Sequence, residues 1–310
     1  MNIQHSYKEY RDCSFISYLG IVSICDVKPN IEDFINYAEN CVGFTKLDDL
    51  KLDKDGCVIF VKPDYIMIFA ECILPKLTHK VILVSTGSDY IIPSDIPNTE
   101  SWKKILTSDK IIKWYTTNCG LQFPKIVPIP LGVPYNKYTN PIEQEKELQS
   151  VAKILKPITD TNWKAVTNFQ HLMEYGKAFI QKIKLTPRTK VYEILKDKDY
   201  IKFLPKQERI DFWKSCDDSM FIISPFGNGP DCHRTWEALC LGRVPIIQKF
   251  PMNTMFNDLP VVIVNDWKQV SEDFLKKQHE IIINNFQQGK YKMEKLTLKY
   301  WENIIKNTEI

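Results

Sequence analysis

Residues 221–248, FIISPFGNGPDCHRTWEALCLGRVPIIQ, constrain the fold more than any other part of the chain. An apolar run opens the segment, a glycine turn and a helical pattern follow, and a second apolar run closes it. Gly227 and Gly229 mark the turn, and Gly242 is typical of the residue just past a helix. Pro230 suits the first helical position, because its missing N–H would be unpaired there anyway. The pattern predicts a buried strand, a short helix and a second buried strand.

The turn before this helix is a candidate anion site. Backbone N–H groups and the positive end of the helix dipole point to the same place there. Arg234 and Glu237 lie one turn apart on the predicted helix and face roughly the same way. This combination predicts a bound nucleotide, with a diphosphate near Arg234 and sugar hydroxyls near Glu237. The alternative is a plain ion pair between the two on a solvated helix, worth about 0.2–0.5 kcal/mol.

Arginine is scarce in this chain, which gives its positions some weight. The arginines are Arg11, Arg188, Arg209, Arg234 and Arg243. The planar guanidinium suits phosphate oxygens better than the point charge of lysine. Two of the five lie inside residues 221–248, which favours a phosphate ligand there. The alternative is chance scatter in a composition rich in lysine, isoleucine and asparagine.

The overall composition fits an ordinary globular protein. The chain has 310 residues, of which 44% are hydrophobic and 25% charged, and this allows two domains of usual size or one large domain. A net charge of +3 gives no ground for a nucleic-acid partner.

The longest strongly apolar run, residues 65–74, is too short to span a bilayer. Residues 1–10 are polar, unlike a signal peptide. The nine cysteines are odd in number and form no CxxC pair. We therefore expect reduced thiols in a soluble, cytoplasmic protein.

Strands alternate with helices along the whole chain, which predicts a parallel α/β architecture. In the first half we expect strands at 15–27, 57–61, 80–84, 110–115 and 125–129, and helices at 31–41, 65–74 and 101–106. After a polar, helical connector at 141–155, a second unit has expected strands at 163–169, at both ends of residues 221–248 and at 260–264. Its expected helices cover 175–183, 189–197, 206–216 and 269–285, and a last amphipathic helix covers 290–306. Ligands of such sheets bind beyond the carboxyl ends of the strands.

Several familiar sites are excluded by their missing residues. A dinucleotide fingerprint would need a third glycine at position 232, which is Cys232. No Gly-Lys-Ser/Thr follows the glycines, and no Gly-x-Ser-x-Gly of a serine hydrolase is present. The five histidines do not pair at metal-ligand spacing. We therefore expect neither a bound metal nor a tightly bound cofactor.

The same segment resembles the donor-binding signature of exostosin-like glycosyltransferases. The resemblance is carried by SPFGNGPD at 224–231, then Arg234, WEAL at 236–239, Gly242 and VPII at 244–247. It implies a GT-B fold, in which two Rossmann-like α/β domains with parallel sheets face a central cleft. It further implies that Glu237 contacts the ribose, and that Gly227, Gly229 and Arg234 hold the diphosphate. The full set of expected donor-binding residues is Asn168, Arg188, Ser224, Gly227, Asn228, Gly229, Asp231, Arg234 and Glu237.

The resemblance also implies a division of labour along the chain. Residues 1–136 would form the acceptor-side domain, 137–158 a connector and 159–286 the donor-binding domain. Residues 287–310 would form a C-terminal helix that returns to the first domain. Such enzymes usually need no bound metal, so positive groups and helix dipoles must stabilise the departing diphosphate.

An inverting transferase also needs a base near the acceptor hydroxyl. Asp89 is one candidate, because it follows the expected strand 80–84; the alternative is a turn or cap residue. His233 is the other, at the helix start, where a packing or capping role is the alternative. The function implied is transfer of a sugar from a UDP- or GDP-sugar to a hydroxyl of a glycan or glycoprotein. The alternatives are a catalytically inactive module that binds a glycan or nucleotide, and a nucleotide-dependent oxidoreductase.

Overall fold

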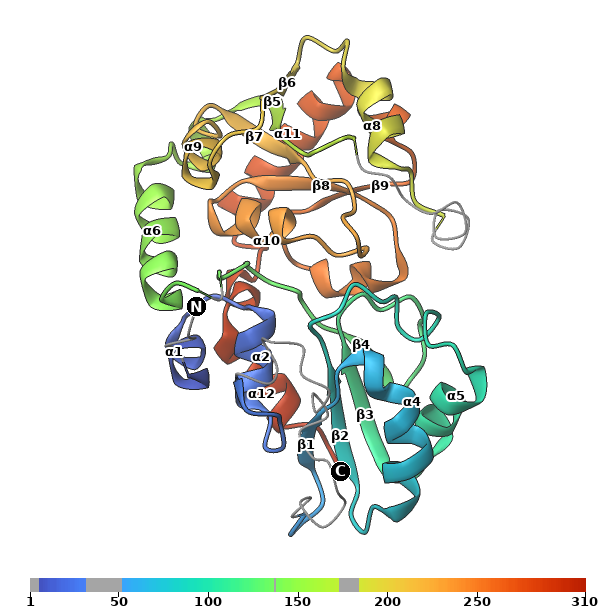
Figure 1. The fold of residues 1–310 in the computed structure, drawn as a ribbon. Helices are drawn as coiled ribbons and strands as arrows, with labels where there is room; N and C mark the ends of the chain where they lie inside the picture. The colour runs from blue at the N-terminus through green and yellow to red at the C-terminus, as the bar shows by residue number, and fades with distance from the viewer. Residues whose placement is uncertain (1–5, 32–51, 137, 173–183) are drawn as a thin grey trace. The chain divides into compact units, whose positions relative to one another are not determined.

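The computed structural model describes residues 6–31, 52–136, 138–172 and 184–310. The chain forms two compact units, drawn as a ribbon in Figure 1. Unit 1 consists of Met1–Glu145, Gly229–Asp231 and Glu294–Ile310, and unit 2 of Lys146–Asn228 and Cys232–Met293. The C-terminal segment therefore belongs to unit 1, as do three residues of the glycine turn.

Unit 1 is built on a four-stranded parallel sheet with the strand order β1-β2-β3-β4. Its strands are β1 (Cys57–Phe60), β2 (Val81–Ser85), β3 (Ile111–Thr116) and β4 (Ile126–Pro128). All four were predicted, with ends that differ by one or two residues. β1 and β2 are buried along their whole length, because helices cover both faces of a parallel sheet.

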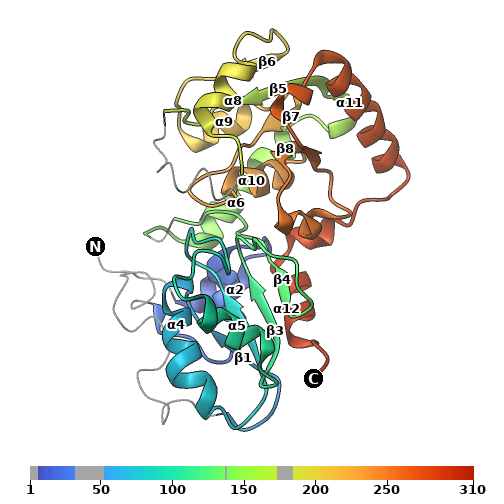
Figure 2. The same cartoon turned by 90° about the vertical axis from the view of Figure 1, so that its right-hand side faces the viewer.

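The helices of unit 1 lie on both sides of this sheet. They are α1 (Tyr7–Asp12), α2 (Tyr18–Ile24), α4 (Ile66–Ile68), α5 (Thr99–Thr107) and α12 (Leu298–Lys306). Figures 1 and 2 show α4 and α5 on one side and α12 on the other, with α12 packed against α2. The predicted helix 65–74 is irregular: α4 continues into a π-helical turn, Phe69–Ile73, and a 3₁₀ turn, Leu74–Lys76.

The strand predicted at 15–27 is wrong, because its central part is helix α2. Ser17 caps this helix by accepting a hydrogen bond from the Gly20 N–H at 3.0 Å. A Cβ on Gly20 would lie 3.2 Å from Leu298, so glycine permits the close approach of α12. Every residue of α2 after Tyr18 is buried, and a helix buried all round has the same apolar run as a buried strand.

Unit 2 is built on a five-stranded parallel sheet with the order β6-β5-β7-β8-β9. Its strands are β5 (Asn162–Thr167), β6 (Ile201–Phe203), β7 (Ser219–Ile223), β8 (Val244–Gln248) and β9 (Val262–Val264). β6 was not predicted, because an edge strand of three residues leaves too short a pattern. The strand order reverses between β5 and β7, and this topological switch point is where doubly wound sheets bind ligands.

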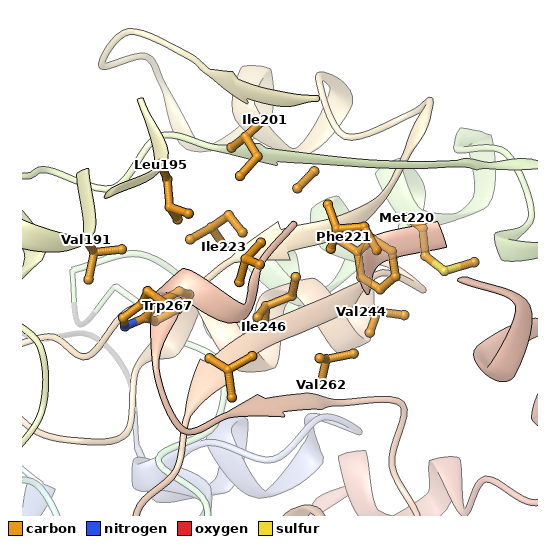
Figure 3. Packing of buried hydrophobic residues seen from close by; sticks show 14 of the residues in the cluster. Val191, Leu195, Ile201, Met220, Phe221, Ile223, Val244, Ile246, Val262 and Trp267 are labelled. Carbon is orange, nitrogen blue, oxygen red and sulfur yellow. The ribbon is translucent and has the colours of Figure 1, made fainter. Parts of the chain in front are cut away.

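Helices α8 (Arg188–Leu195) and α11 (Glu272–Gln287) contribute to the main hydrophobic core of unit 2. Figure 3 shows Val191 and Leu195 of α8 in one cluster with Phe221, Ile223 and other core-facing strand residues. Helices α9 (Arg209–Lys214) and α10 (His233–Cys240) are absent from this cluster, since right-handed crossovers place them on the opposite face. The connector helix α6 spans Pro141–Ile154.

The structure corrects the predicted start of α10 and confirms its end. The helix begins at His233 with Cys232 as N-cap, so Pro230 lies before the helix rather than at its first position. Gly242 has φ +67° directly after the helix. Its N–H donates to the Leu239 carbonyl at 3.0 Å, and the Arg243 N–H donates to the Ala238 carbonyl at 2.8 Å. This pair of bonds is a Schellman motif, which favours glycine at the left-handed position.

The α/β class, with a parallel sheet in each of two units, is confirmed. The helices predicted at 31–41 and 175–183 fall on residues outside the described part of the chain, apart from the start of the first. Within the described ranges, no helix has the length and apolar character needed to cross a membrane.

Candidate functional site

The carboxyl edge of the unit 2 sheet, at the switch point between β5 and β7, brings several predicted residues together. The Thr167 hydroxyl at the end of β5 donates to the Ile223 carbonyl at the end of β7, at 2.9 Å. Asn168 follows β5 and is half-buried, and the glycine turn begins directly after β7. In doubly wound sheets, the loops on the two sides of a switch point diverge, and ligands bind in the crevice outside the carboxyl ends of the strands.

The turn that follows β7 is held against the start of α10. Ser224 is buried, and its hydroxyl lies 2.9 Å from that of Thr235 in α10. The Ser224 N–H donates to the Ile246 carbonyl in β8 at 2.9 Å. Gly227 is half-buried and Asn228 is exposed. Ser224 therefore fixes the buried end of the turn, whereas Gly227 and Asn228 are accessible to solvent in part or in full.

Arg188 links the loops on the two sides of the switch point. It was predicted to bind the donor, and its side chain is 6% exposed at the start of α8. Its Nε donates to the Phe226 carbonyl at 2.7 Å, and its Nη1 to the Gln170 carbonyl at 3.5 Å. These bonds position the loops after β5 and β7, and the donor-binding role of Arg188 stays a prediction.

The start of α10 carries a concentration of positive charge. Nη2 of Arg188 lies 3.8 Å from the Cys232 sulfur, and Nη1 of Arg234 lies 3.7 Å from the same atom. Arg234 and His233 are both half-buried. Two guanidinium groups thus approach the N-cap of a helix whose dipole also favours an anion at this end.

Glu237 forms an ion pair with Arg209 rather than with Arg234. Arg209 Nε lies 2.5 Å from Glu237 Oε1, with side chains that are 34% and 13% exposed respectively. Arg209 is the first residue of α9, whose start lies at the carboxyl edge because α9 follows β6. Sequence reasoning missed this residue; the available signal was a rare arginine in the predicted helix 206–216.

Two residues predicted to bind the donor, Gly229 and Asp231, make their described contacts within unit 1. The Asp231 carboxylate accepts the Leu131 N–H at 2.8 Å, and the Asp231 N–H donates to Asn118 Oδ1 at 3.0 Å. A Cβ on Gly229 would lie 2.5 Å from Nδ2 of Asn118, so this close approach requires glycine. Asn118 itself has φ +50° and donates to the Ser88 carbonyl at 3.1 Å. These contacts order the carboxyl-edge loops of the unit 1 sheet.

The two candidate bases lie in different units. Asp89 is exposed in the turn that follows β2 of unit 1, and His233 is the first residue of α10 in unit 2. Their catalytic roles stay predictions. Among the residues with described positions, no three His, Cys, Asp or Glu side chains gather in a way that could hold a metal ion.

Comparison with known proteins assigns no family to the chain. No protein-family model matches, and no curated protein matches. Among solved structures, the chain resembles UDP-GlcNAc 2-epimerase from Methanocaldococcus jannaschii, with 16% sequence identity and a TM-score of 0.35. That match covers 80% of this chain and 75% of the epimerase chain. A likeness at this level assigns no function.

Proposed function

We propose that the chain is a GT-B glycosyltransferase that uses a nucleoside-diphosphate sugar, a UDP- or GDP-sugar, as donor. The acceptor is a hydroxyl of a glycan or glycoprotein, and no resident metal or cofactor takes part. The observation that carries this proposal is the carboxyl edge of the unit 2 sheet. There the start of α10, with Arg234 and the nearby guanidinium of Arg188, adjoins a glycine turn at the switch point.

Each residue of this edge has a proposed role in donor binding. Arg234 and the N–H groups at the start of α10 bind the diphosphate, because both favour negative charge. Gly227 and Asn228 let the backbone approach the phosphates closely, and Asn168 lines the opposite side of the switch point. Glu237 accepts hydrogen bonds from the ribose hydroxyls through its carboxylate.

The remaining predicted residues have supporting roles. Arg188 and Ser224 hold the loops in place through the contacts described above. Gly229 and Asp231 act through the order that they give to the loops of unit 1. This division separates groups that would touch the donor from groups that position them.

The proposed reaction forms one bond and breaks one. The acceptor oxygen attacks the anomeric carbon, and the bond between that carbon and the β-phosphate oxygen breaks. The diphosphate leaves with an added negative charge, which Arg234 and the α10 dipole stabilise. The acceptor proton passes to a base, for which Asp89 and His233 are the proposed candidates.

The test is an assay of sugar transfer and nucleotide release over a panel of UDP- and GDP-sugars with mixed glycan acceptors. We expect one donor to release its nucleoside diphosphate in an acceptor-dependent way. Arg234→Gln and Glu237→Gln should each lower kcat/KM at least about tenfold, since each removes a charge-assisted hydrogen bond. Asp218→Asn is the matched control, because it removes an ion pair with Lys156 at the amino edge of β7.

The same assay separates the proposal from its alternatives. Donor binding without turnover for any acceptor would contradict transfer and favour an inactive binding module. Copurified absorbance of a nicotinamide or flavin would favour an oxidoreductase. Full activity in both variants would contradict the assignment of this edge as the donor site.

A further inference from the structure

The Arg209–Glu237 ion pair leaves most of its hydrogen-bonding capacity unused. A guanidinium has five N–H donors, and of these only the Nε donor of Arg209 has a partner among the described residues. Glu237 likewise uses Oε1, while no described group hydrogen-bonds to its Oε2. A third of the Arg209 side chain is exposed. One face of the pair therefore offers N–H donors beside a carboxylate oxygen.

The guanidinium of Arg209 lies over an aromatic ring. Its central carbon lies 4.6 Å from the ring centroid of Trp213, one turn further along α9. Trp213 is 1% exposed, so it is a fixed platform rather than a mobile surface ring. Stacking on an aromatic ring fixes the direction of the remaining N–H groups. The ion pair and the ring together hold both polar groups before any ligand arrives.

We propose that Arg209 is a specificity-determining residue that recognises, together with Glu237, the ribose hydroxyls of the nucleotide. This inference rests on the proposed function, in which Glu237 binds the ribose. Oε2 of Glu237 accepts a hydrogen bond from one hydroxyl, and an Nη group of Arg209 donates to the oxygen of the neighbouring hydroxyl. A vicinal diol suits such a pair, because each hydroxyl both donates and accepts.

A paired acceptor and donor predict discrimination against a deoxyribose. A site that is built to hydrogen-bond a hydroxyl rejects the analogue without it, because polar groups of the site are left unpaired. A purely structural ion pair on a partly exposed surface would have no such effect on nucleotide choice. The ratio of affinities for a nucleotide and its 2′-deoxy form therefore separates the two roles, whereas stability alone does not.

The experiment measures this ratio by calorimetry for the full chain. The probes are UDP and GDP, each paired with its 2′-deoxy form, and the tighter pair is used. We expect the wild type to favour the ribonucleotide by about tenfold or more. Arg209→Gln and Glu237→Gln should each reduce this preference at least about fivefold. Asp218→Asn, the control at the amino edge, should keep the wild-type ratio.

Arg209→Lys guards against a trivial loss of folding. It keeps the positive charge beside Glu237 and should unfold at the wild-type temperature. The lysine lacks the planar fork that pairs with a carboxylate and a hydroxyl at once, so the preference should still fall at least about threefold. If both Arg209 variants keep the wild-type ratio while Glu237→Gln loses it, the inference on Arg209 is overturned and the proposed function stands. If the wild type binds neither ribonucleotide, the proposed function fails, and the inference fails with it.

Discussion

Arginines at the two edges of the unit 2 sheet are used in opposite ways. Arg243, at the amino edge, is 1% exposed and donates hydrogen bonds to five backbone carbonyls at 2.9–3.5 Å. The acceptors are Cys216, Leu241, Gly242, Lys156 and Asp217. Arg209, at the carboxyl edge, uses one donor and stays a third exposed. At the amino edge, the N–H donors of Arg243 are used within the protein. At the carboxyl edge, most N–H donors of Arg209 have no partner among the described residues.

This difference shows that residue type alone does not decide whether an arginine stabilises the fold or is available to a ligand. In the sequence, Arg234 and Arg243 counted equally toward a phosphate site, because both lie in residues 221–248. In the structure, Arg243 directly precedes β8 and is bonded to the segments that lead into β5 and β7, and burial lowers its pKa. Its donors are all directed at the protein itself. Arg234 lies instead at the start of α10, beside the Cys232 sulfur.

The largest expected effect is the loss of stability when Arg243, the arginine at the amino edge, is replaced. Arg243→Met keeps an unbranched apolar side chain but removes the guanidinium, which leaves five carbonyls without their donor. We expect the free energy of unfolding to fall by about 3 kcal/mol or more. Urea unfolding followed by circular dichroism measures this change. Arg234→Met, the matched change at the carboxyl edge, should shift the free energy of unfolding by less than about 1 kcal/mol. Equal losses in the two variants would remove the distinction between the edges.

The second largest expected effect is a difference in alkylation rate between a cysteine at the amino edge and one at the carboxyl edge. Burial raises the pKa of Cys216 to about 12 at the amino edge, so its thiol stays protonated at pH 8. Cys232, at the carboxyl edge, is half-buried and accessible in part. We expect iodoacetamide to label Cys232 at least about a hundredfold faster than Cys216, because the thiolate is the nucleophile. Peptide mass mapping after a timed reaction gives both rates. Comparable rates at native pH would contradict the contrast in burial.

The raised pKa of Cys216 also sets a direction for stability against pH. A group whose pKa is higher in the folded state keeps its proton in that state and releases it on unfolding. Its contribution is complete below the ordinary thiol value of 9.0 and is lost as the pH rises toward about 12. Thermal unfolding in that range should therefore show a falling midpoint.

The sequence predicted most elements of the sheet and missed those without a distinctive pattern. The helix α10 apart from its start, its Gly242 stop and strand β8 were correct, because a glycine between a helical pattern and an apolar run leaves few alternatives. α2 was mistaken for a strand because its burial hides the helical period. β6 was too short to detect. Arg209 was missed because its partner, Glu237, is distant in sequence, and only the fold of unit 2 brings the two together.

The smallest expected effect separates two glycines in the same segment. Gly242 has φ +67°, and a Cβ added there would meet no atom within 4 Å, so Gly242→Ala should cost about 1 kcal/mol of stability through backbone strain alone. Its nucleotide affinity should stay that of the wild type. Gly227 lies outside the left-handed region, so Gly227→Ala should keep its stability but weaken nucleotide binding. Urea unfolding measures the stability of both variants, and calorimetry measures their nucleotide affinity. The same loss of stability in both would contradict it.

The proposed function depends on the binding of a nucleoside diphosphate at the carboxyl edge of the unit 2 sheet. The most direct test is calorimetric titration of the wild type and Arg234→Gln with UDP and with GDP. We expect the wild type to bind at least one of the two and the variant to bind it at least about tenfold more weakly, since a charge-assisted hydrogen bond to phosphate is lost. Unchanged affinity in Arg234→Gln, or no binding of either nucleotide by the wild type, would contradict it.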